Sequence, residues 1–177
     1  LNKKEKLSNL SSQKNEEIIK NLSEKIIKLG GKPSLETEDQ KDIIKDLNKQ
    51  FEQLSVKSIL NDKSKNIIKD QILNKIKVRF QKVIDLPPKD LRKLVDIGKK
   101  ELSEGIVIVF ASKEGKIGLA VGVTHNLTST YDAVKFVKIG SEIVGGKGGG
   151  GRPDFAQAGG INENKIEEAF EKLKSLI

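Results

Sequence analysis

Residues 106–124, IVIVFASKEGKIGLAVGVT, predict a β-hairpin at the centre of a sheet. The first half, from Ile106 to Ala111, is continuously apolar and rich in β-branched residues, which is typical of a strand buried on both faces. Glu114 and Gly115 supply a turn, so residues 117–124 are expected to run back antiparallel. The sequence on either side should therefore pack onto this pair.

The flanking segments predict one further strand and three helices. Residues 76–84 place Ile76, Val78 and Phe80 between Lys and Arg, as in an amphipathic strand. Pro87 and Pro88 are expected to open a helix that ends at residue 102. Further helices are expected over 130–144 and 164–177, separated by a glycine-rich loop. This order predicts a small α/β (α+β) domain with a mixed sheet and packed helices over residues 75–177.

The first 74 residues are expected to form a helical subdomain. Only Gly30 and Gly31 precede residue 90, whereas fourteen of the 16 glycines follow it. One helix is expected over residues 16–29, ending at Gly30. A second should begin near Ser34 or Thr37, because residues 37–40 read as a capping box. Residues 64–73 are interpreted as a further short helix.

The second of these helices carries a regular apolar seam. Its members, spaced by three, four and three residues, are Ile44, Leu47, Phe51 and Leu54. This spacing is that of a short coiled coil and suggests dimerisation. Packing against the preceding helix explains the seam equally well.

Residues 145–160, GGKGGGGRPDFAQAGG, form the most distinctive segment, with eight glycines in sixteen residues. Glycine leaves backbone N–H groups accessible, and Lys147 and Arg152 add positive charge, so the segment suits an anionic partner. A dinucleotide fingerprint is unsupported, because these glycines follow an expected helix rather than a strand. A Walker loop is excluded because Gly148 follows Lys147. A purely structural loop is the other interpretation, and Phe155 fits either a stacking or a core role.

The same segment closely resembles the signature at the C-terminal end of bacterial alanyl-tRNA synthetases, GGKGGGRPDxAQAGG, with one additional glycine within residues 148–151. Resemblance continues upstream through LPPKDLRKLVD at 86–96, GIVIVFAS at 105–112 and GKIGLAVGVT at 115–124. It covers the second half of the chain strongly and the first half only in its helical character.

This resemblance implies a DHHA1-type fold that grips the outer corner of tRNA, expected to be alanine tRNA, in the cytoplasm. Carried over residue by residue, the tRNA-binding positions are Lys147, Gly148, Gly149, Gly150, Gly151, Arg152 and Gln157. The family also assigns dimerisation to the helical part. Its ATP, magnesium and zinc sites belong to earlier domains, so no cofactor and no catalysis are expected in this piece.

Composition is consistent with this interpretation. The chain has 177 residues, 33 Lys and Arg against 25 Asp and Glu, a net charge of +8, and neither Cys nor Met. Without cysteine there is no disulfide and no thiolate zinc site, and the single histidine, His125, has no candidate catalytic partner. The charge favours an acidic partner, but lysine-rich solvated helices account for it equally well. No segment has the pattern of a signal peptide, the longest apolar run is too short to span a membrane, and the start at Leu1 suggests a piece of a longer protein.

Two other functions fit less well. The accessory domain of a DHH-family phosphoesterase has a similar fold, but its glycine motif usually ends in histidine, where this chain has Arg152. The second is an oligomerisation module without RNA binding, in which the glycine segment is merely structural.

Overall fold

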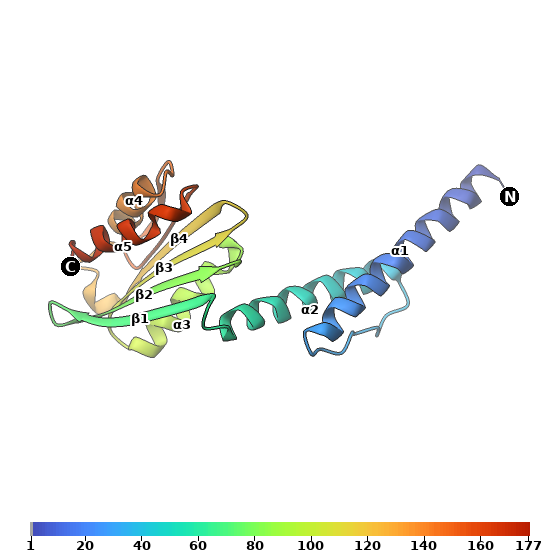
Figure 1. The fold of residues 1–177 in the computed structure, drawn as a ribbon, viewed down its shortest axis with the longest axis horizontal. Helices are drawn as coiled ribbons and strands as arrows, with labels where there is room; N and C mark the ends of the chain where they lie inside the picture. The colour runs from blue at the N-terminus through green and yellow to red at the C-terminus, as the bar shows by residue number, and fades with distance from the viewer. Residues whose placement is uncertain (1) are drawn as a thin grey trace. The chain divides into compact units, whose positions relative to one another are not determined.

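A computed structural model describes residues 2–177, which form two compact units, the first ending at Asn61 and the second covering Asp62–Ile177 (Figure 1). The first unit contains two helices. The second contains a six-stranded sheet with three helices.

The helices of the first unit are α1, Lys3–Lys28, and α2, Gln40–Asn61. A capping box opens α1: Asn2 Oδ1 accepts from the Glu5 N–H at 2.9 Å, and Glu5 Oε2 accepts from the Asn2 N–H at 3.1 Å. The expected start of α2 near Ser34 or Thr37 is wrong. Asp39 is the cap instead, and its Oδ1 accepts from the Lys41 N–H at 2.8 Å. Residues 32–38 stay non-helical partly because Gln50 hydrogen-bonds the backbone of Lys32 and Ser34.

The apolar seam of α2 packs against α1. Leu47 is fully buried with Leu22 and Ile26 of α1, and Ile44, Phe51 and Leu54 are half-buried around them. Packing within the unit, the second interpretation of this spacing, therefore accounts for Leu47. A role of the seam in dimerisation stays a prediction.

The sheet of the second unit has the strand order β1-β2-β3-β4-β6-β5. Its strands are β1 Asn66–Leu73, β2 Ile76–Ile84, β3 Ile106–Lys113, β4 Lys116–Val123, β5 Gly149–Arg152 and β6 Phe155–Gly160. Only β2 and β3 pair in parallel, so the predicted mixed sheet is confirmed. The predicted hairpin of β3 and β4 turns at Glu114 and Gly115, with φ of 52° and 78°.

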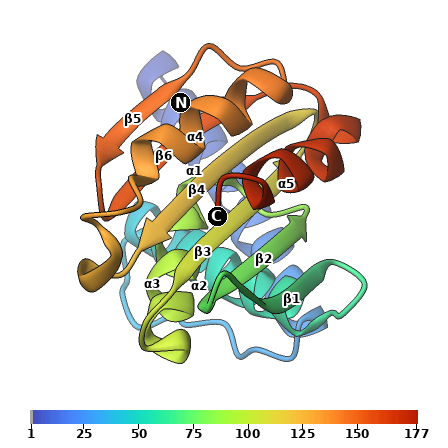
Figure 2. The same ribbon diagram turned by 90° about the vertical axis from the view of Figure 1, so that its left-hand side faces the viewer.

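Helices cover both faces of this sheet. Helix α3, Leu91–Leu102, packs on one face of β3 and β4, and α4, Ala133–Ile143, and α5, Ile166–Lys174, pack on the other, which is the near face in Figure 2. The larger core lies under α4 and α5. There the ring of Phe170 meets Phe80 and Phe110 edge-on, with centroids 5.5 and 5.0 Å apart.

Two local expectations are corrected. Residues 64–73 are not a helix, because residues 66–73 pair along their whole length with β2 through a tight turn at Asn74 and Lys75, both at positive φ. Residues 145–160 are not a loop throughout, because most of them form the antiparallel hairpin of β5 and β6 at the edge of the sheet. Glycine has a low propensity for strands, so the hairpin forms through backbone pairing with the neighbouring strands and not through side-chain preference.

Candidate nucleic-acid interface

The glycine segment forms the last hairpin of the sheet. β6 pairs on one side with β4 and on the other with β5, so β5 is the edge strand. Gly149, Gly150, Gly151 and Arg152, four of the expected tRNA-binding residues, make up the whole of β5, and Gln157 lies opposite Gly150 on β6. The structure therefore brings these five positions together on one hairpin.

Close backbone packing explains why most of the run is glycine. A Cβ on Gly149 would lie 2.0 Å from the Gln157 carbonyl oxygen, and one on Gly151 would lie 2.4 Å from that of Phe155. Gly148 has φ of 93°, a conformation that favours glycine. At Gly150, in contrast, a Cβ would meet nothing within 4 Å.

Ser141 of α4 fixes the position of the hairpin. Its buried hydroxyl donates to the Gly159 carbonyl at 2.7 Å and accepts from the Gly148 N–H at 3.3 Å. The same hydroxyl would lie 2.2 Å from a Cβ on Gly146. Sequence reasoning missed Ser141, because one serine within an amphipathic helix carries no recognisable signal.

Strand register decides which side chains share a face. Gly122 of β4 lies directly against Val95 and Lys99 of α3. Phe155 pairs with Gly122, and side chains alternate along a strand, so Phe155 and Gln157 point to the α3 side of the sheet. By the same register Gly150 and Arg152 of β5 share this side, which we call the α3-side face of the hairpin.

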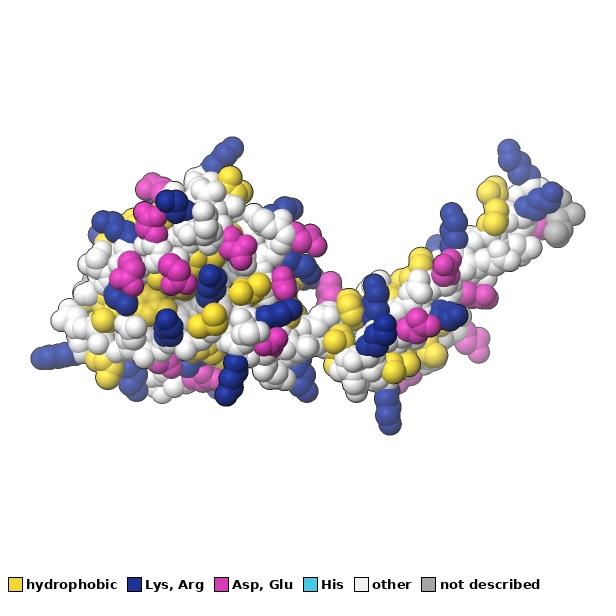
Figure 3. All heavy atoms as spheres, viewed as in Figure 1, with side chains coloured by type: hydrophobic (Ala, Val, Ile, Leu, Met, Phe, Trp, Pro, Cys, Tyr) yellow, Lys and Arg dark blue, Asp and Glu magenta, His cyan; other side chains and the backbone are white. Residues whose placement is uncertain are grey.

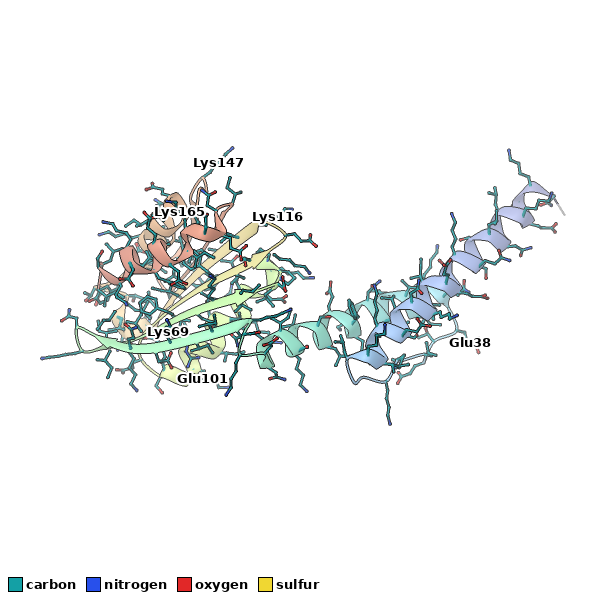
Figure 4. All side chains as sticks on the ribbon, in the orientation of Figure 1. Glu38, Lys69, Glu101, Lys116, Lys147 and Lys165 are labelled. Atoms are coloured by element: carbon teal, nitrogen blue, oxygen red, sulfur yellow. The ribbon has the colours of Figure 1, made fainter. Side chains whose placement is uncertain are left out.

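Lys147 lies apart from Arg152. It belongs to the loop between α4 and β5, is exposed, and projects away from the sheet in Figure 4. Arg152 ends β5 at the other end of the strand, and its Nε lies 3.5 Å from Asp154 Oδ1. The two expected cations therefore flank the hairpin instead of forming one pocket.

Two further cations of α3 lie beside this face. The Arg92 guanidinium carbon lies 4.8 Å from the centroid of the half-buried Phe155 ring, within cation–π range. Lys99 Nζ donates to the carbonyl oxygen of Asp154 at 2.7 Å. Arg92 and Lys99 are seven residues, or two helical turns, apart, so both lie on one side of α3. This spacing was the signal in the sequence that could have identified the pair.

Other polar groups serve the fold. Arg79 is buried, and hydrogen bonds to Asp70 at 2.8 and 3.0 Å, together with one to Glu101, raise its pKa. That charge is committed to joining β1, β2 and α3. His125 is exposed in the turn His125–Leu127, and Asp132 caps α4.

Charge is not concentrated in one large patch on the side of the molecule seen in Figure 3. Lys and Arg side chains there are interspersed with Asp and Glu. Within residues 2–177 no three His, Asp or Glu side chains are grouped so as to hold a metal ion. The hairpin with its flanking cations has the positive charge and bare backbone that would suit an anionic, flat partner, and its side chains include no nucleophile–base pair.

Comparison with known proteins agrees with this geometry. Residues 75–177 match the model of the DHHA1 domain, which is more than half of the chain. The chain belongs to the DHHA1 domain family. The predicted family and fold are thereby confirmed, and the β5–β6 hairpin and α3 both lie inside the DHHA1 domain.

Relatives of this DHHA1 chain include alanine–tRNA ligases. The ligase of Parvibaculum lavamentivorans is 48% identical over 103 residues, which are 58% of this chain and 12% of that protein. The ligase of Fusobacterium nucleatum is 37% identical over 161 residues, 91% of this chain and 18% of that protein. The chain thus spans less than a fifth of either relative.

A solved structure resembles the fold as well. The C-Ala domain of Aquifex aeolicus alanyl-tRNA synthetase superposes with a TM-score of 0.58 at 27% identity, covering 61% of this chain and 96% of that one. In the part of the chain that the structure describes, no helix is long and apolar enough to cross a membrane.

Proposed function

We propose that this chain is a non-catalytic C-terminal domain of an alanine–tRNA ligase that holds the outer corner of tRNA. The observation that carries the proposal is the open α3-side face of the β5–β6 hairpin, where Arg152, Gln157 and Phe155 lie beside Arg92 and Lys99. The relatives, alanine–tRNA ligases, support the choice of tRNA as the partner.

The chemistry of this face suits the corner of a folded tRNA. Cations bind phosphates in any sequence, and the absence of side chains at Gly150 and Gly159 allows a flat surface to approach the backbone closely. A-form stems hide base edges in a narrow major groove, whereas a tertiary corner exposes bases. Gripping that corner, expected on alanine tRNA, would let separate synthetic and editing domains share one bound tRNA.

The helical unit is proposed to contribute dimerisation. Of the seam residues, Ile44, Phe51 and Leu54 keep part of their surface accessible, while Leu47 is committed to the contact with α1. A second subunit would therefore meet the margin of the seam. An oligomerisation module without RNA binding, or a DHH-type accessory domain, would form the same helices. Its sedimentation coefficient would not change when tRNA is added.

Competition between full-length tRNA and a minihelix tests the proposed contact. A reader of tertiary shape binds intact alanine tRNA more tightly than a minihelix with the same acceptor stem at matched salt, because the minihelix lacks the corner formed by the D and T loops. Footprinting should show protection of those loops. If tRNA and the minihelix bind with equal affinity per phosphate and the corner is not protected, the chain binds RNA only through non-specific electrostatic attraction and the proposed contact is wrong.

The double variant Lys147→Ala, Arg152→Ala tests the hairpin itself. It should weaken tRNA binding and reduce the salt slope by up to about one unit for each phosphate that is no longer neutralised. Lys63→Ala, Lys65→Ala, which removes two lysines near the start of the second unit, is a charge-matched control expected to have the smaller effect. Equal weakening in both variants would place the RNA-binding surface elsewhere.

A further inference from the structure

Arg92 differs from the other cations around the hairpin in what it touches. Across residues 2–177 its guanidinium makes no ion pair, whereas Arg152 lies near Asp154 and Lys99 is hydrogen-bonded to the Asp154 backbone. The partner of Arg92 is the ring of Phe155, 4.8 Å away. Among the described residues the Arg92 guanidinium thus has no protein hydrogen-bond acceptor, and its aromatic neighbour is the Phe155 ring.

This arrangement favours a nucleobase over a phosphate as the group that Arg92 binds. A guanidinium is planar and stacks on aromatic faces, and unstacked RNA bases bind to such planes. Arg92 lies 4.8 Å from the centroid of the Phe155 ring and is nevertheless exposed as a residue, so a base can reach it from solvent. Gln157 lies two residues along β6 on the same face, roughly 6.6 Å further on, and its amide can both donate to and accept from a base edge.

We propose that Arg92, supported by Phe155, is a base-stacking residue of this chain, and that Gln157 meets the edge of the stacked base. The inference rests on the proposed function, since it names a subsite for an exposed RNA base on the same face. Lys147 and Arg152 meet the phosphates in that function. Arg92 adds an interaction in which planarity matters more than charge.

Two variants separate planarity from charge. Arg92→Lys keeps the positive charge but removes the planar guanidinium, and Arg92→Ala removes both the charge and the planar group. Lys93→Ala is the matched control, because Lys93 is the exposed next residue of α3 and its removal changes the net charge as Arg92→Ala does. Phe155→Leu keeps an apolar side chain under Arg92 but removes the aromatic face.

The binding of the 177-residue chain to alanine tRNA and to heparin, a polyanion without bases, is measured for each variant. We expect Arg92→Lys to weaken tRNA binding roughly tenfold, close to the effect of Arg92→Ala, with heparin affinity unchanged. Phe155→Leu should also weaken tRNA binding. Lys93→Ala should lower the affinities for tRNA and for heparin slightly and equally. Thermal unfolding of the variants verifies that each remains folded.

Other outcomes would overturn the stacking subsite. Retained tRNA affinity in Arg92→Lys means that Arg92 meets a phosphate, and parallel weakening for tRNA and heparin means that it acts through charge or folding. If the Arg92 and Phe155 variants bind tRNA as tightly as the unmodified chain while Lys147→Ala, Arg152→Ala still weakens tRNA binding, the inference fails and the proposed function stands. If the unmodified chain prefers heparin and ignores the tRNA corner, both fail.

Discussion

Gly149 and Gly150 are neighbours in β5, but an added side chain would meet very different surroundings at the two positions. At Gly149 it would run into the carbonyl oxygen of Gln157, and at Gly150 it would face open space. The pair therefore separates a glycine needed for packing from one that is not. A single glycine motif in the sequence contains both kinds.

Alanine at these two positions gives a residue-scale prediction. Gly149→Ala should lower the free energy of unfolding by about 1–3 kcal/mol, because β5 must shift away from β6, and it should weaken tRNA binding as well. Gly150→Ala is the control for stability alone and should stay within about 0.5 kcal/mol of the unmodified chain, although the added methyl lies on the face proposed to meet tRNA and should therefore weaken binding without unfolding. Urea unfolding and tRNA titration measure both effects. Equal destabilisation by the two substitutions would contradict the register of this hairpin.

Sequence could identify some site residues but not their neighbours. Lys147, Arg152 and Gln157 stand out because they interrupt a long glycine motif. Arg92 and Ser141 lie on separate helices, and only folding brings them to the hairpin, through the Phe155 ring and the Gly159 carbonyl. Proximity of this kind depends on strand order, which the local pattern does not contain.

At the scale of elements, helices α1 and α2 depend on one small core. Leu47→Ala should destabilise the helical unit by about 2–5 kcal/mol, since a fully buried leucine is removed from a cluster of few residues. Leu7→Ala, at a side chain that is 59% exposed, should leave stability nearly unchanged. Helix content by circular dichroism and association state by sedimentation distinguish the alternatives. A Leu47→Ala chain that keeps its helices and only loses a dimer would show that the seam faces another subunit.

Elements with strong local patterns were predictable, and those that depend on a partner were not. The strands beginning at Ile76 and Ile106 were confirmed because alternation or β-branched runs specify them locally. In β1, NIIKDQIL, the apolar residues fit either a helix or a strand, and pairing with β2 decides the outcome. β5 has almost no side chains, so its sequence shows no strand preference at all.

At the scale of the whole molecule, the candidate interface lies entirely within the second unit. A fragment of residues 62–177 contains the six strands, α3 and a core of its own, so it should fold and keep salt-sensitive binding to tRNA. The lysines of the helices should add only non-specific attraction. Filter binding of the fragment and the whole chain over a salt series measures this. Loss of binding with intact folding would assign RNA recognition to the helical unit.

The edge position of β5 also has a dynamic consequence. Glycine loses more conformational entropy on ordering than other residues. Gly149–Arg152 pairs with a strand, β6, on one side only, and is otherwise held by its position beside α4 and by the hydrogen bond between Ser141 and Gly148. This strand should therefore open locally while the rest of the sheet stays closed. A bound RNA would offset that ordering cost as it docks, so its presence should slow amide hydrogen exchange in the hairpin far more than in β3 and β4.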